Sequence, residues 1–162
     1  MIRILVAVLV VLGASSPAVA QGTDPFMGTW RLSLEKSKFP GPPPALPYIV
    51  TFEQNADSSI LGIVYALDEQ DKRTAVARIT YRYDGKEYKD FDVVKNVPAT
   101  NALSFTRIDR NTLDVTHKLN EGKLVFMERR TVSVDGRTMT FLLTATDLRG
   151  QTVSVIQVFD RL

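Results

Sequence analysis

Residues 102–141 read ALSFTRIDRNTLDVTHKLNEGKLVFMERRTVSVDGRTMTF, and this stretch decides the fold. Apolar and polar residues alternate along it, which is the period of a β-strand with one buried face. Three short turn signals interrupt the alternation, at Asp109-Arg110-Asn111, Glu121-Gly122 and Asp135-Gly136. The pattern predicts antiparallel strands at 102–108, 112–119 and 124–134, each joined to the next by a tight hairpin.

The turns also predict the register, because turn length decides which residues of two strands lie opposite each other. The expected pairs are Arg107 with Leu113, Phe105 with Val115, Leu103 with His117, His117 with Phe126, Val115 with Glu128, Leu113 with Arg130, Arg130 with Phe141, and Glu128 with Leu143. A three-residue turn ending at Gly150 extends the same face to Val153, Val155, Gln157 and Phe159. Each turn carries one apolar face onto the next, so the sequence predicts a meander in which sequential strands are neighbours.

The rest of the chain continues the β pattern, and no segment after residue 20 has a helical period. Strands are predicted at 30–34, 48–54, 60–66, 74–83, 138–146 and 152–161, whereas 88–100 is less regular and is interpreted as an edge or a loop. Asp84-Gly85 predicts a further hairpin, of type I′. Closure of such a meander removes its two exposed edges. We therefore expect an all-β, up-and-down antiparallel barrel of about eight or more strands, in which the strand of Trp30 pairs with that of Phe159.

A proline-rich segment separates the first strand from the second. Five of the eight prolines of the chain fall within residues 40–47. Proline removes a hydrogen-bond donor and restricts φ, so this segment cannot be a central strand. It is predicted to be a stiff, extended connection, and the sequence assigns it no further role.

Residues 1–20 have the features of a Sec-type signal peptide. Met1-Ile2-Arg3 is basic, residues 4–12 are uncharged and apolar, and Ala18-Val19-Ala20 has the small residues of a cleavage site. The apolar run is shorter than the ~20 residues of a transmembrane helix. We expect cleavage after Ala20, a single domain at 21–162, no membrane insertion after cleavage, and a periplasmic or secreted location.

The composition argues against several classes of partner. The chain has 20 Lys and Arg against 18 Asp and Glu; without Arg3 the balance is 19 against 18, so the mature protein is close to neutral. Such a charge provides no electrostatic reason to bind nucleic acid. The chain has no cysteine, so its stability must come from a packed core instead of disulfides.

Two motifs carry a resemblance to a known group of barrels. Gly28-Thr29-Trp30 resembles the G-x-W that opens the first strand of lipocalins, and Arg161 stands where those proteins have an Arg that packs over the Trp. The chain thus resembles the lipocalin and wider calycin group, and also small exported bacterial lipocalin-like proteins that share a stretch like Lys36-Ser37-Lys38-Phe39. The resemblance implies a calycin-like ligand-binding barrel without catalysis. The missing disulfide, the missing helix before the last strand and the proline-rich segment depart from the lipocalin pattern.

The predicted inner face supplies the candidate site residues. The candidate ligand-binding residues are Tyr81, Phe105, Arg107, His117, Phe126, Glu128, Arg130, Phe141 and Gln157, and Trp30 with Arg161 is expected to close one end of the barrel. Two interpretations of the charged members remain open. Arg107 and Arg130 can anchor a ligand carboxylate. Alternatively, the arginines form a network with Glu128 that spans neighbouring strands, or a local bulge turns these residues outward.

His117 is the only histidine of the chain, and it has two interpretations of its own. It is a core histidine with satisfied hydrogen bonds, or it is an axial haem ligand. A metal site built from several histidines is excluded, and no metal or cofactor is expected.

Three functions are compatible with these residues. The first is an exported, non-enzymatic binding protein for a small apolar or amphipathic molecule held inside the barrel. The second is a structural or interaction module whose barrel is filled and which acts through its surface. The third is a haem protein that uses His117. No nucleophile motif, catalytic acid pair or phosphate-binding loop is present in the sequence.

If the signal peptide is real, full-length protein made in a bacterial host will lose its first 20 residues. Intact mass and N-terminal sequencing should then give a chain that starts at Gln21. Ala20→Arg should block cleavage, because the cleavage pocket takes only small side chains. A wild-type protein that retains Met1, as the Ala20→Arg variant should, would contradict the prediction.

Overall fold

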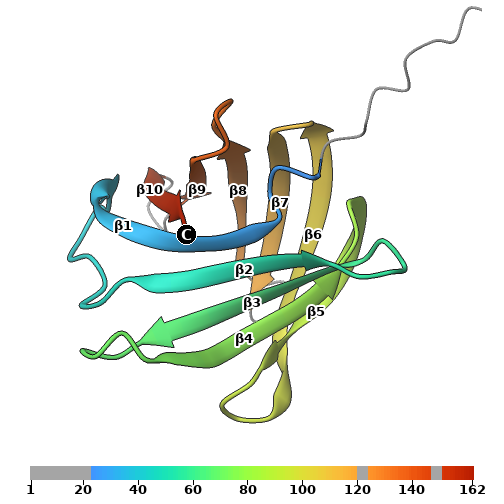
Figure 1. The fold of residues 1–162 in the computed structure, drawn as a ribbon. Helices are drawn as coiled ribbons and strands as arrows, with labels where there is room; N and C mark the ends of the chain where they lie inside the picture. The colour runs from blue at the N-terminus through green and yellow to red at the C-terminus, as the bar shows by residue number, and fades with distance from the viewer. Residues whose placement is uncertain (1–22, 120–123, 147–150) are drawn as a thin grey trace, which may run out of the picture.

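The computed structural model describes residues 23–119, 124–146 and 151–162, and these form ten β-strands and no helix (Figure 1). In chain order the strands are β1 (Gly28–Lys38), β2 (Tyr48–Gln54), β3 (Ile60–Leu67), β4 (Arg73–Tyr81), β5 (Asp84–Asp92), β6 (Val97–Asp109), β7 (Thr112–Leu119), β8 (Leu124–Val132), β9 (Thr138–Thr146) and β10 (Thr152–Arg161). No helix that could span a membrane occurs in these parts of the chain.

The strands form one closed antiparallel barrel in which every strand pairs with its neighbours in sequence. The circle closes where β1 pairs with β10, with Trp30 opposite Arg161 and Leu32 opposite Phe159. The predicted all-β meander and its closure are confirmed. The count is ten, within the expected range, because the irregular region at 88–100 contributes an additional hairpin.

The predicted register of the second half is confirmed pair by pair. Phe105 lies opposite Val115, His117 opposite Phe126, and Arg130 opposite Phe141. On β10, Gln157 pairs with Phe141 as expected. The turns expected at Glu121-Gly122 and at residues 148–150 lie outside the described residues, as do the signal peptide and the expected cleavage site after Ala20.

The type I′ turn predicted at Asp84-Gly85 is wrong, although the two pairs that its flanking strands share have the register that it predicts. Strand β4 ends at Tyr81, and Asp84 and Gly85 already belong to β5, where Asp84 pairs with Thr106 of β6. The two strands that this hairpin should have joined, β4 and β5, share only the pairs Ala77 with Asp92 and Arg78 with Phe91. Between these pairs and the connection from β4 to β5, the two strands are therefore not paired, and β5 pairs there with β6 alone.

The real hairpin in this region joins β5 to β6 at residues 93–96. It contains no glycine; Asn96 adopts the left-handed conformation, with φ of 56°, and the side chain of Asp92 accepts a hydrogen bond from the Lys95 backbone N–H at 2.9 Å. Asn and Asp are the residues that make such turns without glycine. This explains why residues 88–100 lack a clear strand period in the sequence.

One end of the barrel is closed by Trp30 and Arg161. The Trp30 side chain is fully buried, and the Arg161 guanidinium lies 4.0 Å from the centre of its ring. Arg161 also ties the chain that precedes β1 to the turn before β9. It does so by donating hydrogen bonds of 2.6–2.7 Å to the backbone carbonyl oxygens of Pro25, Met27 and Gly136.

Gly28 makes this closure possible. Its φ is +121°, and a Cβ atom built there would lie 2.6 Å from an Arg161 guanidinium nitrogen. Any side chain at this position would therefore strain the backbone and displace Arg161 from Trp30. The glycine of the G-x-W motif is thus required by geometry.

Gly28→Ala should destabilise the protein by about 1–3 kcal/mol, because it combines backbone strain with displacement of Arg161. The measurement is the free energy of unfolding in urea. Gly41→Ala is the matched control, since nothing lies within 4 Å of its added methyl group and its φ is not positive. Equal stability of the two variants would show that the Arg161 contact does not hold this end closed.

Candidate functional site

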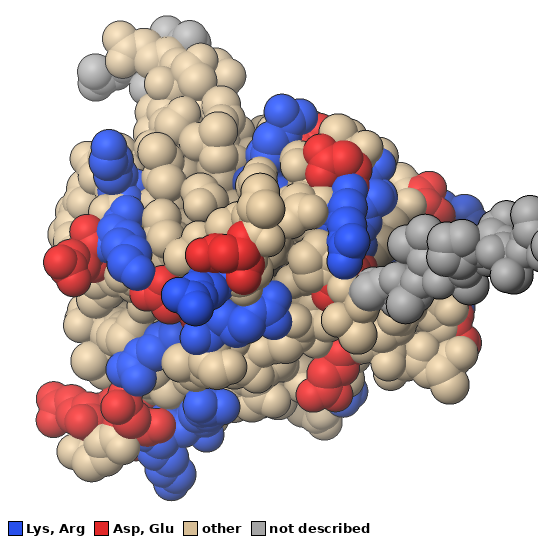
Figure 2. All heavy atoms as spheres, turned by 45° about the horizontal axis from the view of Figure 1, so that its top comes forward, with Lys and Arg blue, Asp and Glu red and all other residues tan. Residues whose placement is uncertain are grey.

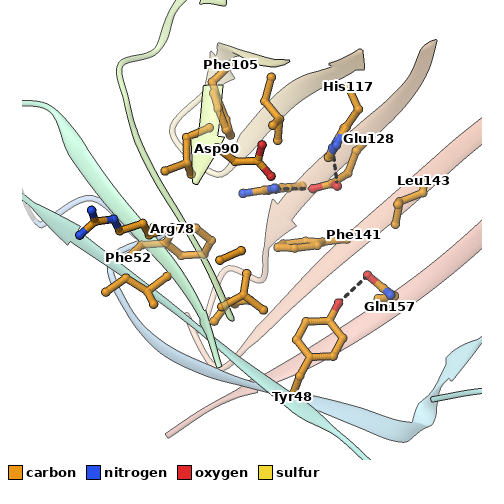
Figure 3. A pocket seen from close by; sticks show the side chains of 18 residues that line it. Tyr48, Phe52, Arg78, Asp90, Phe105, His117, Glu128, Phe141, Leu143 and Gln157 are labelled. Atoms are coloured by element: carbon orange, nitrogen blue, oxygen red, sulfur yellow. Dashed lines mark hydrogen bonds and ion pairs between the residues drawn. The ribbon is translucent and has the colours of Figure 1, made fainter. Parts of the chain in front are cut away.

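A cavity of about 300 Å³ lies inside the barrel (Figure 3). Strands β2 to β10 all contribute to its wall, and most of the lining side chains are apolar. The rings of Phe52, Phe105 and Phe141 form its aromatic part. Cavities of this size with apolar walls and a few polar groups are typical small-molecule sites in proteins.

Six of the lining side chains carry polar groups that alternation along their strands turns inward. They are Tyr48 of β2, Asp90 of β5, His117 of β7, Glu128 and Arg130 of β8, and Gln157 of β10. Because side chains two apart in a strand share a face, Glu128 and Arg130 both enter the interior from one strand. The site therefore depends on the register across the whole barrel and not on any local motif.

Glu128 is the centre of an internal network. The Arg130 guanidinium donates a hydrogen bond to one of its carboxylate oxygens, and His117 Nε2 lies 2.9 Å from the other. Both members of the ion pair are buried, with 4% of Glu128 and 7% of Arg130 exposed. The internal Arg–Glu network was one of the two interpretations of the sequence, but the pair lies along one strand, with the histidine contributed by the neighbouring strand.

The network decides the charge of Glu128. Burial on its own raises the pKa of a carboxyl group, but the Arg130 charge and the hydrogen bonds from His117 and Arg130 outweigh this, and the pKa of Glu128 falls to about 2. The carboxylate is therefore ionised at neutral pH. Arg130 also lies 4.4 Å from the centre of the Phe141 ring, so it is held between an anion and an aromatic face.

Tyr48 and Gln157 form a second polar contact across the cavity. The Tyr48 hydroxyl donates a hydrogen bond of 3.0 Å to the Gln157 side-chain oxygen, as the dashed line in Figure 3 marks. Burial and then the nearby Glu128 charge raise the pKa of Tyr48 well above its ordinary value, so the hydroxyl keeps its proton. The hydroxyl therefore continues to donate its hydrogen bond to Gln157 at physiological pH.

Asp90 differs from the other polar groups because one of its carboxylate oxygens, Oδ1, is buried and has no hydrogen-bond partner among the described residues. Burial raises the pKa of this carboxyl group. Asp90 precedes Phe91 and Asp92, the two residues through which β5 pairs with β4. It therefore lines the cavity where the two strands separate.

The structure brings six of the nine predicted ligand-binding residues together around the cavity: Phe105, His117, Glu128, Arg130, Phe141 and Gln157. It places the other three elsewhere. Tyr81 lies behind the wall, stacked on Phe105 with ring centres 3.7 Å apart, and Phe126 stacks on His117 at 4.2 Å.

Arg107 belongs to the closed end and not to the cavity lining. It is ion-paired with Asp24, and its guanidinium lies 4.1 Å from the centre of the Tyr83 ring. The expected anchor role for a ligand carboxylate does not fit this position, because the lead-in to β1 already supplies the counter-charge. The sequence could not show this, since Asp24 precedes the first strand.

Twelve of the 18 lining residues were not among the predicted site residues, and three of these, Tyr48, Phe52 and Asp90, matter most to the chemistry of the cavity (Figure 3). Tyr48 and Phe52 alternate within a predicted strand, so the period of two could have placed them on the inner face. Asp90 lies in the irregular region, where no period was visible.

Comparisons with known proteins agree on the fold. No family model matches the chain, and no curated protein matches it. Among solved structures, the chain is similar to the wild-type fluorescent protein UnaG, with a TM-score of 0.58 and 14% sequence identity over 85% of this chain and 97% of that one. It is also similar to a secretory abundant heat soluble protein from Ramazzottius varieornatus, with a TM-score of 0.58 and 9% identity over 86% and 96% of the two chains.

A third similar structure is the zebrafish ileal bile acid-binding protein complexed with cholic acid. Its TM-score is 0.54, with 13% identity over 85% of this chain and 99% of that one. At these identities the comparisons establish the fold, which is a ten-stranded barrel of the calycin type. The resemblance expected from the Trp30 and Arg161 motifs is confirmed at the level of fold.

Glu128→Gln should destabilise the protein by about 3 kcal/mol at pH 7, because it leaves the buried Arg130 charge without its counter-ion. The double variant Glu128→Leu with Arg130→Met should recover most of that loss, since it removes both charges. The measurement is urea unfolding. Asp114→Asn, which removes the exposed ion pair with Arg129, is the control and should cost less than about 1 kcal/mol.

The same pair predicts a pH dependence. The folded-state pKa of Glu128 is depressed, so its stabilisation is present above the unfolded-state value of 4.5 and is lost as the pH falls towards about 2. Unfolding free energy measured over this range should fall more steeply for the wild type than for Glu128→Gln. Parallel curves would show that folding does not lower the pKa of Glu128.

Proposed function

We propose that this protein binds a small, largely apolar or amphipathic molecule inside its barrel. The observation that supports this most directly is the cavity of about 300 Å³, with its aromatic wall and its six inward-pointing polar side chains. A ligand with an apolar body that fits the cavity would gain dispersion contacts with the three phenylalanine rings.

The comparisons support binding more than catalysis. One similar structure is described as a bile acid-binding protein complexed with cholic acid, and another as a fluorescent protein. We therefore propose that the chain is not an enzyme. We also propose that it is exported, on the basis of the sequence features of residues 1–20 alone.

The second candidate function is a filled interaction module that acts through its surface. The observation in its favour is that Glu128 is already satisfied by Arg130 and His117 without a ligand. Figure 2 shows basic and acidic side chains interspersed on one face of the barrel, a distribution without the uniform charge that a polyanion-binding surface requires. The haem hypothesis is weaker, because haem would have to displace the contact between His117 Nε2 and Glu128.

The variant Ala77→Phe should distinguish the proposed binding function from the filled interaction module. Ala77 lines the cavity from β4, so a ring added there occupies ligand space. The neutral fluorescent dye prodan should bind the wild type and bind the variant at least about tenfold more weakly, while the melting temperature stays close to that of the wild type. Thr80→Phe adds the same ring at an exposed position of β4 and is the control.

The filled-barrel alternative predicts the opposite pair of results. Prodan would not bind the wild type, and the added ring would overpack the interior at a cost of about 1–3 kcal/mol. Native mass spectrometry of protein purified without detergent provides an independent test, because a co-purifying ligand appears as extra mass that is lost on denaturation.

A further inference from the structure

We propose that the ligand of this cavity carries a positively charged amine and that Asp90 binds it. The inference rests on the proposed binding function and adds the chemical class of the ligand. It follows from the charges that the described residues place inside the barrel, which include one carboxylate oxygen without a partner and no unpaired cation that could receive an anion.

The buried guanidinium of the cavity is already neutralised. Arg130 and Glu128 form a buried ion pair, and the second oxygen of Glu128 faces His117 Nε2 at 2.9 Å. A ligand carboxylate placed at Arg130 would share that site with Glu128, and two carboxylates at one site repel each other. The network therefore disfavours an anionic head group at the place where the sequence predicted one.

Arg78 does not change this balance. Arg78 belongs to the cavity wall, but it is exposed to solvent, and its guanidinium lies 4.6 Å from the centre of the Phe91 ring. In Figure 3 its side chain points away from Asp90 and Glu128. Its charge thus faces the outside of the barrel, where water screens it.

Asp90 is the group that lacks compensation. Its Oδ1 atom is buried without a hydrogen-bond partner among the described residues, and none of the ion pairs within them includes its carboxylate. Leaving a buried acceptor unpaired costs free energy, more so when it is charged. An ammonium group supplies both the counter-charge and up to three donors.

The charges of the interior disfavour an anionic ligand in either protonation state of His117, and they favour a cation when His117 is neutral. With a neutral His117, the interior has two carboxylates, Asp90 and Glu128, against the single guanidinium of Arg130. With a protonated His117, the charges balance before any ligand enters. In neither state does the interior have excess positive charge for an anion, whereas the neutral state has one negative charge for a cation.

The rest of the cavity fits the other end of such a ligand. Phe52, Phe105 and Phe141 offer an apolar, aromatic surface to a hydrocarbon body. Asp90 lies on the side of the wall where β4 and β5 separate. An amphipathic amine can therefore place its body among the rings and its ammonium at Asp90.

Decylamine, decanoic acid and 1-decanol test the proposal, because they share a hydrocarbon chain and differ in head group. Isothermal titration at pH 7, below the micelle concentration, should give decylamine an affinity at least about tenfold higher than that of decanoic acid. Asp90→Asn keeps the shape of the side chain and removes its charge. It should lower the affinity for decylamine about tenfold and change that for 1-decanol by less than about threefold.

Asp114→Asn is the matched control, since it removes a carboxylate from β7 that is paired with Arg129 and does not line the cavity. It should leave all three affinities unchanged. Decanoic acid binding as tightly as decylamine, or a preference for the amine that survives Asp90→Asn, would overturn the assignment of Asp90 while leaving the binding function intact. Failure of all three probes, together with failure of prodan, would overturn the binding function itself.

Discussion

The pairing of β1 with β10 is the constraint on which the rest of the structure depends. A meander of ten strands has two free edges, and only closure brings the inner faces of all strands around one interior. Closure is secured at one end by Arg161, which covers the buried Trp30 ring and binds the backbone on both sides of the seam. Gly28 supplies the space that this guanidinium needs.

The interior combines apolar packing, which stabilises the fold, with a buried ion pair, which costs free energy to remove from water. Apolar packing holds the closed end, where Trp30, Leu32 and Phe159 are almost wholly buried. Farther along the barrel, the Glu128 and Arg130 pair introduces charge into the interior, and such a pair is stable only while both members are present. Because His117 binds the remaining Glu128 oxygen, the network is satisfied without a ligand, yet a cavity remains beside it.

The proposed binding function requires a barrel that is stable and still has room for a ligand. The satisfied network fixes the positions of polar groups in advance, so a ligand would not have to order them. Asp90 is the exception, since its buried oxygen lacks a partner among the described residues. A binding site that is organised everywhere except at one unsatisfied group selects ligands by what that group requires.

The sequence by itself determined the strands, the register from β6 to β10 and the inner face that carries His117, Glu128 and Arg130. Local alternation and short turns are sufficient for these features, because each turn decides the register of its own hairpin. The motifs at Trp30 and Arg161 likewise indicated the closed end. For the same reason the sequence does not predict the hairpin between β5 and β6, where the alternation of apolar and polar residues is weak.

Only the tertiary structure decided which inward residues share a cavity. Arg107 and Arg130 have the same pattern in the sequence, but Asp24 neutralises Arg107 at the closed end, and that contact joins residues 83 positions apart. Asp90 lines the cavity from a strand whose pairing with β4 ends at Arg78 and Phe91, and no local sequence pattern predicts where that pairing ends. Charge compensation and strand separation are long-range properties, so the chemistry of the site becomes visible only once the barrel is closed.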